Sequence, residues 1–163
     1  MISIRRVASG EERFLWSVFH SSVHEVARSQ YTQEQLDAWA PAQYPGDAWE
    51  SRIIRNRPFI AELEGVIVGF ADIQPNGYID QFFVSGKAVG KGVGMRLMAV
   101  LKEMAKANHI PRMFSNVSTS AEPFFLKHGF VVQERRSVMI RGVRLNNARM
   151  CRLLSKRPRG EGK

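Results

Sequence analysis

A glycine-rich stretch, Val84 to Gly94, is the segment of this sequence with the clearest chemical meaning. Its glycines at positions 90, 92 and 94 alternate with Lys91 and Val93, directly before residues with helical spacing. Glycine lets a ligand approach the backbone closely, and a helix N-terminus adds about half a positive charge. The pattern therefore favours a bound pyrophosphate. A helix start that uses glycine only for close packing is the alternative.

Two better-known phosphate motifs do not fit this stretch. No Gly-Lys-Ser or Gly-Lys-Thr ending closes the loop, as a P-loop requires. The strands expected before it are joined by hairpins, whereas a dinucleotide-binding fingerprint follows the first strand of a parallel βαβ unit.

Asp80 and His24 are the candidate general bases. Alternation along an expected strand at 78–84 places Tyr78, Asp80 and Phe82 on one face. A carboxylate there is able to take a proton from a substrate, directly or through water. His24 lies on the first expected helix and titrates in the neutral range. The alternatives are an Asp80 that is solvated or paired with an arginine, and a His24 on the helix surface.

The sequence gives little support to a metal or disulfide site. His20 and His24 have the i,i+4 spacing that chelates metals on a helix, but no third ligand accompanies them. We therefore expect no metal. Cys151 is the single cysteine, which excludes an intrachain disulfide and a cysteine-based zinc site. Its apolar neighbours indicate a buried structural thiol.

The first third of the chain is expected to be mostly helical after a short alternating strand at its start. Apolar residues between positions 10 and 28 have helical spacing. Thr32 to Gln35 forms a capping-box pattern, which starts a helix that stops before Pro41. Asp47 is the expected N-cap of a third helix that runs to about Asn56.

From Arg57 onwards the period changes to two, and the chain is expected to form strands. Glu64-Gly65 marks a tight hairpin, and Gly129 is a natural C-cap for a short helix before it. The expected order is a meander of strands at 59–63, 66–73 and 78–84, a helix after Gly94, a strand at 113–118, a helix at 122–127 and a hairpin at 130–154.

This order of elements, with the Gly-x-Gly-x-Gly helix and Ala121-x-x-Phe-Phe-x-Lys-x-Gly-Phe130, resembles the GNAT superfamily of acetyl-CoA-dependent N-acetyltransferases. The resemblance covers nearly the whole chain, and the insert from Tyr31 to Pro41 looks like one bacterial branch of mostly uncharacterised members. It implies an α/β fold, with a mixed, mainly antiparallel central sheet flanked by helices and a splayed V between the fourth and fifth strands. It implies a single acetyltransferase domain at 1–155. Residues 156–163 are expected to form a basic flexible tail.

The resemblance also implies that acetyl-CoA is the cosubstrate. The family's loop pattern, Gln/Arg-x-x-Gly-x-Gly/Ala, maps onto Val89 to Gly94, with Val89 in place of the Gln or Arg. The resemblance implies that the strand before the loop binds the pantetheine arm through backbone groups. It also implies a contact from a side chain of the next strand, for which Ser118 is the first candidate and Asn116 the second. The implied cofactor-binding residues are Phe82, Phe83, Val84, Val89, Gly90, Lys91, Gly92, Val93, Gly94, Asn116, Ser118 and Phe125.

The implied reaction is transfer of an acetyl group to a primary amine of a small molecule or peptide, by direct attack in a ternary complex. A backbone N–H of residues 82–84 is implied to stabilise the oxyanion. The family often has Tyr where this chain has Phe125, and Phe cannot donate a proton. A CoA thiol is a fairly acidic leaving group, so a dedicated acid is not obligatory. Phe125 also favours an alternative, a non-catalytic acyl-CoA-binding or sensing module.

The family places its variable acceptor surface in the helical insert, where Tyr31, Trp39, Tyr44 and Trp49 cluster. Tyr31 and Trp39, together with Tyr78, are the expected substrate-binding residues. Packing in a core is the alternative for aromatic residues at helical spacing.

Charge is distributed unevenly along the 163 residues. Residues 1–134 carry equal numbers of basic and acidic side chains, so the net charge of +9 comes entirely from residues 135–163. A nucleic-acid-associated protein is an alternative that only this basic segment favours, since no aromatic-and-basic RNA motif accompanies it. The longest apolar stretches fall far short of the ~20 residues of a membrane span, and no signal peptide is evident. We expect a cytoplasmic monomer or homodimer without nucleic-acid or membrane partners.

Overall fold

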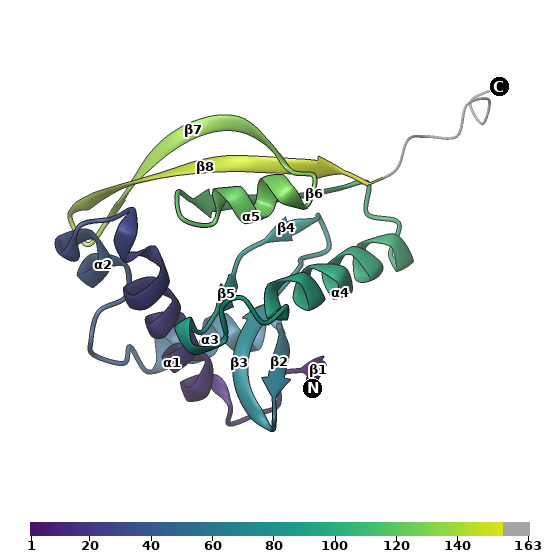
Figure 1. Cartoon of the computed structure of the whole chain (residues 1–163), viewed down its shortest axis with the longest axis horizontal. Helices are drawn as coiled ribbons and strands as arrows, with labels where there is room; N and C mark the ends of the chain where they lie inside the picture. The colour runs from purple at the N-terminus through teal and green to yellow at the C-terminus, as the bar shows by residue number, and fades with distance from the viewer. Residues whose placement is uncertain (155–163) are drawn as a thin grey trace.

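The computed structural model describes residues 1–154, and the predicted basic tail lies outside them (Figure 1). Two four-stranded sheets form its centre. The first sheet is antiparallel, in the order β1 (Ile2–Arg6), β2 (Phe59–Leu63), β3 (Val66–Ala71), β5 (Phe82–Val84). The second sheet has the order β4 (Tyr78–Ile79), β6 (Arg112–Ser118), β8 (Val143–Leu153), β7 (Val131–Ile140). Within it, only β4 and β6 run parallel.

The helices lie against both faces of the first sheet and beside the second (Figure 1). They are α1 (Glu12–Ser21), the π-helix η1 (Ser22–Val26), the 3₁₀ turn η2 (Ala27–Ser29), α2 (Gln33–Trp39), α3 (Asp47–Asn56), the 3₁₀ turn η3 (Gly86–Ala88), α4 (Val93–Ala107) and α5 (Glu122–Lys127). The predicted fold class is confirmed: a mixed, mainly antiparallel α/β structure flanked by helices. No helix among residues 1–154 has the length and apolar character needed to cross a bilayer.

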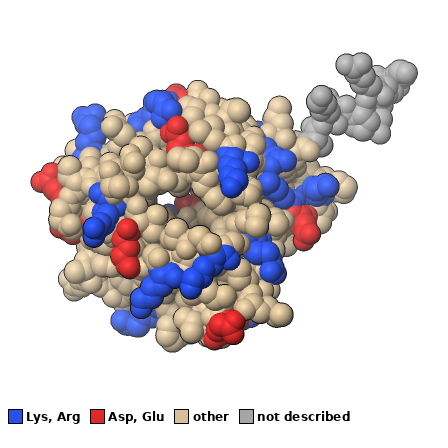
Figure 2. Space-filling model, viewed as in Figure 1, with Lys and Arg blue, Asp and Glu red and all other residues tan. Residues whose placement is uncertain are grey.

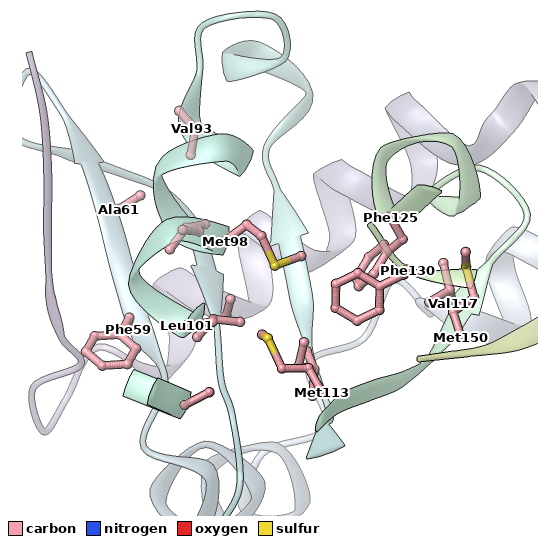
Figure 3. Close-up of a cluster of buried hydrophobic side chains, with 14 of the residues drawn as sticks. Phe59, Ala61, Val93, Met98, Leu101, Met113, Val117, Phe125, Phe130 and Met150 are labelled. Atoms are coloured by element: carbon pink, nitrogen blue, oxygen red, sulfur yellow. The ribbon is translucent and has the colours of Figure 1, made fainter. Parts of the chain in front are cut away.

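Strand alternation divides the buried side chains into two cores, one on each face of the first sheet. Ile60 and Phe70 face α1 and α3, where they join Leu15 and Ile53. The residues on the other side of these strands, such as Ala61, pack against α4. Figure 3 shows this second core, in which Met98 and Leu101 of α4 lie near Phe125, Phe130 and Met113.

Two helix predictions need correction. The segment predicted as one helix at 10–28 is α-helical only to Ser21 and continues as a π turn and a 3₁₀ turn. In this wider turn Ser21 accepts a hydrogen bond from the Gly86 N–H at 3.0 Å and donates one to Glu25 at 2.5 Å. The N-cap of α3 is Gly46, at φ +64°, and Asp47 lies in the first turn without a capping hydrogen bond. The capping box at Thr32 and Gln35 is confirmed.

The strand predicted at 78–84 is divided, and its two halves belong to different sheets. Tyr78–Ile79 pairs with β6, whereas Phe82–Val84 pairs with β3. At the break, the buried carboxylate of Asp72 accepts hydrogen bonds from the N–H groups of Asp80 (2.9 Å) and Gln81 (2.8 Å). Asp72 thus replaces the carbonyl oxygens of a neighbouring strand. The predicted V is the gap that opens between β5 and β6 beyond this point.

The titration of Asp72 gives a first testable prediction. Burial raises the pKa of this carboxyl to about 6, despite hydrogen bonds that lower it, whereas an unfolded chain has a value of about 3.9. The folded protein therefore holds this proton to higher pH, and folding becomes less favourable as pH rises from about 4 to about 6. Relative to Asp72→Asn, which does not titrate, the wild type should lose up to about 3 kcal/mol of unfolding free energy between pH 4 and pH 7.

Urea unfolding of both proteins at the two pH values measures this change. An unfolding free-energy difference between wild type and Asp72→Asn that stays constant with pH would contradict the buried, raised-pKa carboxyl.

Candidate active site

The glycine-rich loop leads into the exposed N-terminus of α4. Gly90 and Gly92 have φ of +80° and +85°, a backbone conformation that residues other than glycine rarely adopt. A Cβ atom added at either position would have no atom within 4 Å. Gly92 is the N-cap, and its carbonyl accepts the first helical hydrogen bond from Arg96. The preceding N–H groups of the first turn have no partner within the helix. The loop therefore presents free donors and a positive helix end to solvent.

The third glycine of the motif has a different role. A Cβ on Gly94 would lie 3.0 Å from the ring of Phe124. Gly94 therefore allows α5 to pack closely against α4, so the packing alternative from the sequence holds for this position. Val89 is 54% exposed, and Lys91 is exposed beside it.

The edge of β5 that faces the V carries backbone groups without a partner strand among residues 1–154. One backbone hydrogen bond lies at each end of the strand. Before it, the Asp72 N–H donates to the Gln81 carbonyl, and after it, the Ser85 N–H donates to the Val68 carbonyl. Hydrogen-bonded pairs alternate along an antiparallel ladder, so of the three β5 residues that pair with β3, Phe83 is the one whose N–H and C=O groups face β3. The N–H and C=O groups of Phe82 and Val84 point away from β3, toward the V. Figure 2 shows an opening near the middle of the molecule in the view of Figure 1.

On the other side of the V, Asn116 and Ser118 lie on one face of β6. The Ser118 hydroxyl accepts a hydrogen bond from the Ala121 N–H at 3.2 Å and lies 3.1 Å from the Ser120 hydroxyl. The Asn116 amide nitrogen donates to the Tyr78 hydroxyl at 3.4 Å. Phe125 is only 3% exposed and packs against Phe82 and Phe130.

A cavity of about 380 Å³ lies between the second sheet and α1, α2 and α3. It brings together seven residues that the sequence singled out: Tyr31, Trp39, Tyr78, Asp80, Phe83, Asn116 and Ser118. Trp49 also lines it, whereas Tyr44 does not. The Tyr31 hydroxyl donates to the Asn146 carbonyl at 2.7 Å and accepts from the Thr119 N–H at 2.9 Å, so this ring fixes the wall of the cavity.

The prediction that Tyr78, Asp80 and Phe82 share a face is wrong. Tyr78, Asp80 and Phe83 line the cavity, whereas the ring of Phe82 packs on Phe124 and Phe125 in the core. The cause is the break at Asp80–Gln81, since one irregular step between two strand segments reverses which face later residues occupy.

Asp80 lies in the cavity wall with both carboxylate oxygens hydrogen-bonded from α3. Arg52 donates to them at 2.8 and 3.1 Å, and Asn56 donates at 2.7 Å. Burial raises the pKa of Asp80, but the hydrogen bonds and charge of Arg52 outweigh it, so the pKa lies below its usual value. The arginine-paired alternative is therefore the arrangement in the structure, and the carboxylate is ionised at neutral pH. Sequence pattern gave no sign of Arg52.

His24 does not line the cavity. Its Nε2 donates to the Ala40 carbonyl at 2.7 Å, and its ring stacks on His20 with 4.2 Å between ring centroids. Burial and then the neighbouring His24 lower the pKa of His20. Within residues 1–154, no group of three or more His, Cys, Asp or Glu side chains is arranged to hold a metal ion. Cys151 is a buried free thiol.

Comparison with known proteins gives consistent matches over most of the chain. Residues 27–150 match a family described as an acetyltransferase (GNAT) domain. An uncharacterized N-acetyltransferase, YafP of Escherichia coli (strain K12), is 28% identical over 146 residues, which cover 90% of this chain and 92% of that protein.

Solved structures match as well. A GCN5-related N-acetyltransferase, also named class-II aminotransferase, from Rhodopseudomonas palustris has 30% identity and a TM-score of 0.89, covering 93% of this chain and 95% of that one. The PaiA N-acetyltransferase of Thermoplasma acidophilum, solved with coenzyme A, has 17% identity and a TM-score of 0.77, covering 94% and 99%. At 17% identity, the match to the PaiA structure shows a similar fold and no more.

The ion pair at Asp80 gives a prediction that does not depend on any ligand. Arg52→Gln removes both the charge and the strongest hydrogen bonds, so the pKa of Asp80 should rise. Arg55→Gln is the matched control, because Arg55 contributes charge without a hydrogen bond and should raise that pKa less. Carbon-13 NMR titration of the aspartate carboxyl groups measures both. An unchanged pKa of Asp80 in Arg52→Gln would contradict the ion pair.

Proposed function

The chain belongs to the GNAT family of acetyltransferases, and from this premise we propose that it transfers an acetyl group from acetyl-CoA to a primary amine by direct attack in a ternary complex. The observation that carries the proposal is the open V. Free backbone donors line its β5 edge, the N-terminus of α4 lies at the end of the loop after β5, and the aromatic cavity lies beside both. We propose that residues 1–155 act as one domain in this reaction.

The residues of the loop fit a pyrophosphate. Residues 89–94 would hold it through the backbone N–H groups of the loop and of the first turn of α4, aided by the helix dipole. A donor from the backbone needs no particular side chain, so Val89 is compatible with this role although its side chain makes no polar contact. Lys91 adds positive charge at the exposed side of the loop.

The edge of β5 fits the amide groups of a pantetheine arm. The unpaired N–H and C=O groups of Phe82 and Val84 would be satisfied by those amides, as buried backbone groups require. Ser118 of β6 lines the same cavity as Phe83 of β5, and it is the side chain we assign to the same arm, with Asn116 as the second candidate. Bound acetyl-CoA supplies an activated thioester carbonyl, and a free N–H of β5 would stabilise the negative charge on its oxygen.

In the cavity, Asp80 is the residue we assign to the amine. An ionised carboxylate attracts the ammonium form by its charge. The nitrogen bonds to carbon only as the neutral amine, after it has lost one proton to solvent, and Asp80 then accepts the second proton, which the nitrogen releases once the bond has formed. Tyr31, Trp39 and Tyr78 would contact the rest of the acceptor and exclude water. Phe125 lies in the core and has no proton to give, so the thiolate would leave without a side-chain acid.

Loss of cofactor binding in Gly92→Glu tests the loop. The new carboxylate would meet the bound pyrophosphate, and the juxtaposition of like charges costs several kcal/mol, so the affinity for acetyl-CoA should fall about 100-fold or more. Gly142→Glu is the matched control, because Gly142 also has a positive φ (+78°) and an open Cβ position, but lies in the turn between β7 and β8. Calorimetry measures the two affinities. A folded Gly92→Glu variant with wild-type affinity would show that the loop does not bind the cofactor.

The role of Asp80 is tested by Asp80→Asn. The rate should fall roughly 10²–10⁴-fold, the usual effect of removing a positioned acid or base, while acetyl-CoA affinity stays unchanged. Because the pKa of Asp80 is below its usual value, the loss should be uniform from about pH 6 to about pH 9. Thiol release with a panel of primary amines, including tyramine and spermidine, gives the rates.

Asp37→Asn is the control, because Asp37 is exposed on α2 and accepts a hydrogen bond only from Gln33 among the described residues. A near-normal rate in Asp80→Asn would remove Asp80 from the mechanism. No turnover with any amine, despite acetyl-CoA binding, would favour the acyl-CoA-binding module.

A further inference from the structure

The β7–β8 hairpin concentrates positive charge at one side of the cavity. Residues 131–153 contain six arginines and a single acidic residue, Glu134. Arg135 is paired with Glu122 at 2.8 Å, outside the hairpin. Arg149 has no carboxylate partner among residues 1–154, and Arg136 has only Glu134, at 3.4 Å and itself two-thirds exposed. Most of this charge is therefore not neutralised by the protein.

Two of these arginines converge on one neutral oxygen. The Asn116 side-chain oxygen accepts a hydrogen bond from Arg149 Nε at 3.3 Å and from an Arg136 terminal nitrogen at 3.3 Å. Guanidinium groups this close repel each other, and an amide oxygen carries no charge to offset the repulsion. Both side chains are partly buried and therefore partly desolvated, which makes an anion a better partner than the amide.

The convergence point lies at the edge of the cavity that holds Asp80, since Asn116 lines this cavity whereas Arg136 and Arg149 contact Asn116 from outside its lining. Asn116 and Tyr78 line this cavity, and the Asn116 amide nitrogen contacts the Tyr78 hydroxyl. Burial raises the pKa of Tyr78, followed by the charge of Asp80, while the charges of Arg52 and Arg149 oppose the rise. Arg149 is thus within electrostatic reach of the cavity wall that carries Asp80. Across the cavity, α3 adds Arg52, which is already paired with Asp80.

From this geometry we infer that the acceptor is an amine that carries a carboxylate, with the carboxylate bound by Arg149 and Arg136 and the amine beside Asp80. The inference rests on the proposed acetyl transfer for its amine end, and on the arginine pair alone for its carboxylate end. The aromatic rings that line the same cavity suit an acceptor that also has an apolar part. Arg149 and Arg136 are then specificity-determining residues, since they distinguish an acid from the matching neutral amine.

Matched pairs of acceptors test the inference: phenylalanine against phenylalanine amide, and γ-aminobutyrate against its amide. Charge-assisted hydrogen bonds from the two arginines should give the acid of a pair about 10- to 100-fold higher kcat/KM than its amide, measured by thiol release. The preference should shrink at high salt, since the arginines are only partly buried. In the double variant Arg136→Gln/Arg149→Gln it should fall to within about threefold.

Arg144→Gln is the control for loss of one hairpin charge. Arg144 is on β8 like Arg149, but on the opposite face of the strand, and among residues 1–154 its side chain hydrogen-bonds only to the Ser137 hydroxyl. Its removal should leave the preference for the acid unchanged. Equal use of acid and amide by the wild type, or a preference that survives in the double variant, would overturn the inference.

Binding measurements separate this inference from the proposed reaction. Calorimetry with the CoA-saturated protein compares the affinities of each acid and its amide without any turnover. Tighter binding of the acid that depends on Arg149 supports the carboxylate site even if no acetyl transfer occurs, in which case only the proposed reaction fails. Equal binding of acid and amide overturns the carboxylate site whether or not acetyl transfer is observed.

Discussion

The hydrogen bonds from two consecutive backbone N–H groups to the carboxylate of Asp72 fix the geometry on which the rest of the site depends. Consecutive N–H groups of a regular strand point in opposite directions, so both can reach one carboxylate only where the strand is interrupted. The carboxylate is buried, and the rise of its pKa to about 6 means that the cost of desolvation exceeds the gain from its hydrogen bonds. Each of the two donors bonds to its own carboxylate oxygen, and an amide in this place would set its NH2 group against one of them.

The interruption has two consequences for function. It sends β4 to one sheet and β5 to the other, so β5 is an edge strand and the N–H and C=O groups of Phe82 and Val84 that point away from β3 have no partner strand. It also moves Asp80 out of the strand pattern and into contact with α3. The same break therefore sets the groups that we assign to the cofactor and to the amine, since Asp80 lies directly before Gln81 and Phe82 directly after it.

Local patterns predicted much of this structure, and long-range contacts account for what they missed. Period-two alternation, the Glu64-Gly65 turn and the Thr32 capping box each depend on neighbouring residues, and each is present. The resemblance to a known family predicted the V. The break at Asp80–Gln81 depends instead on a side chain eight residues earlier in the chain, so alternation assigned Phe82 to the wrong face. Arg52 and Arg149 are similarly invisible to sequence pattern, since each acts on a residue more than 25 positions away.

The electrostatics of Asp80 restrict when it can act on an amine. A lysine-like ammonium has a pKa near 10.4, whereas the pKa of Asp80 lies below the usual value of a carboxyl group, so complete proton transfer from the free ammonium to Asp80 is strongly unfavourable. Asp80 therefore does not prepare the nucleophile by removing its proton in advance. Once the nitrogen has bonded to the carbonyl carbon, it becomes far more acidic, and an ionised carboxylate at hydrogen-bond distance is then a competent acceptor. Arg52 keeps Asp80 ionised. This suits the late proton transfer, because the carboxylate is required to be unprotonated when the nitrogen–carbon bond forms.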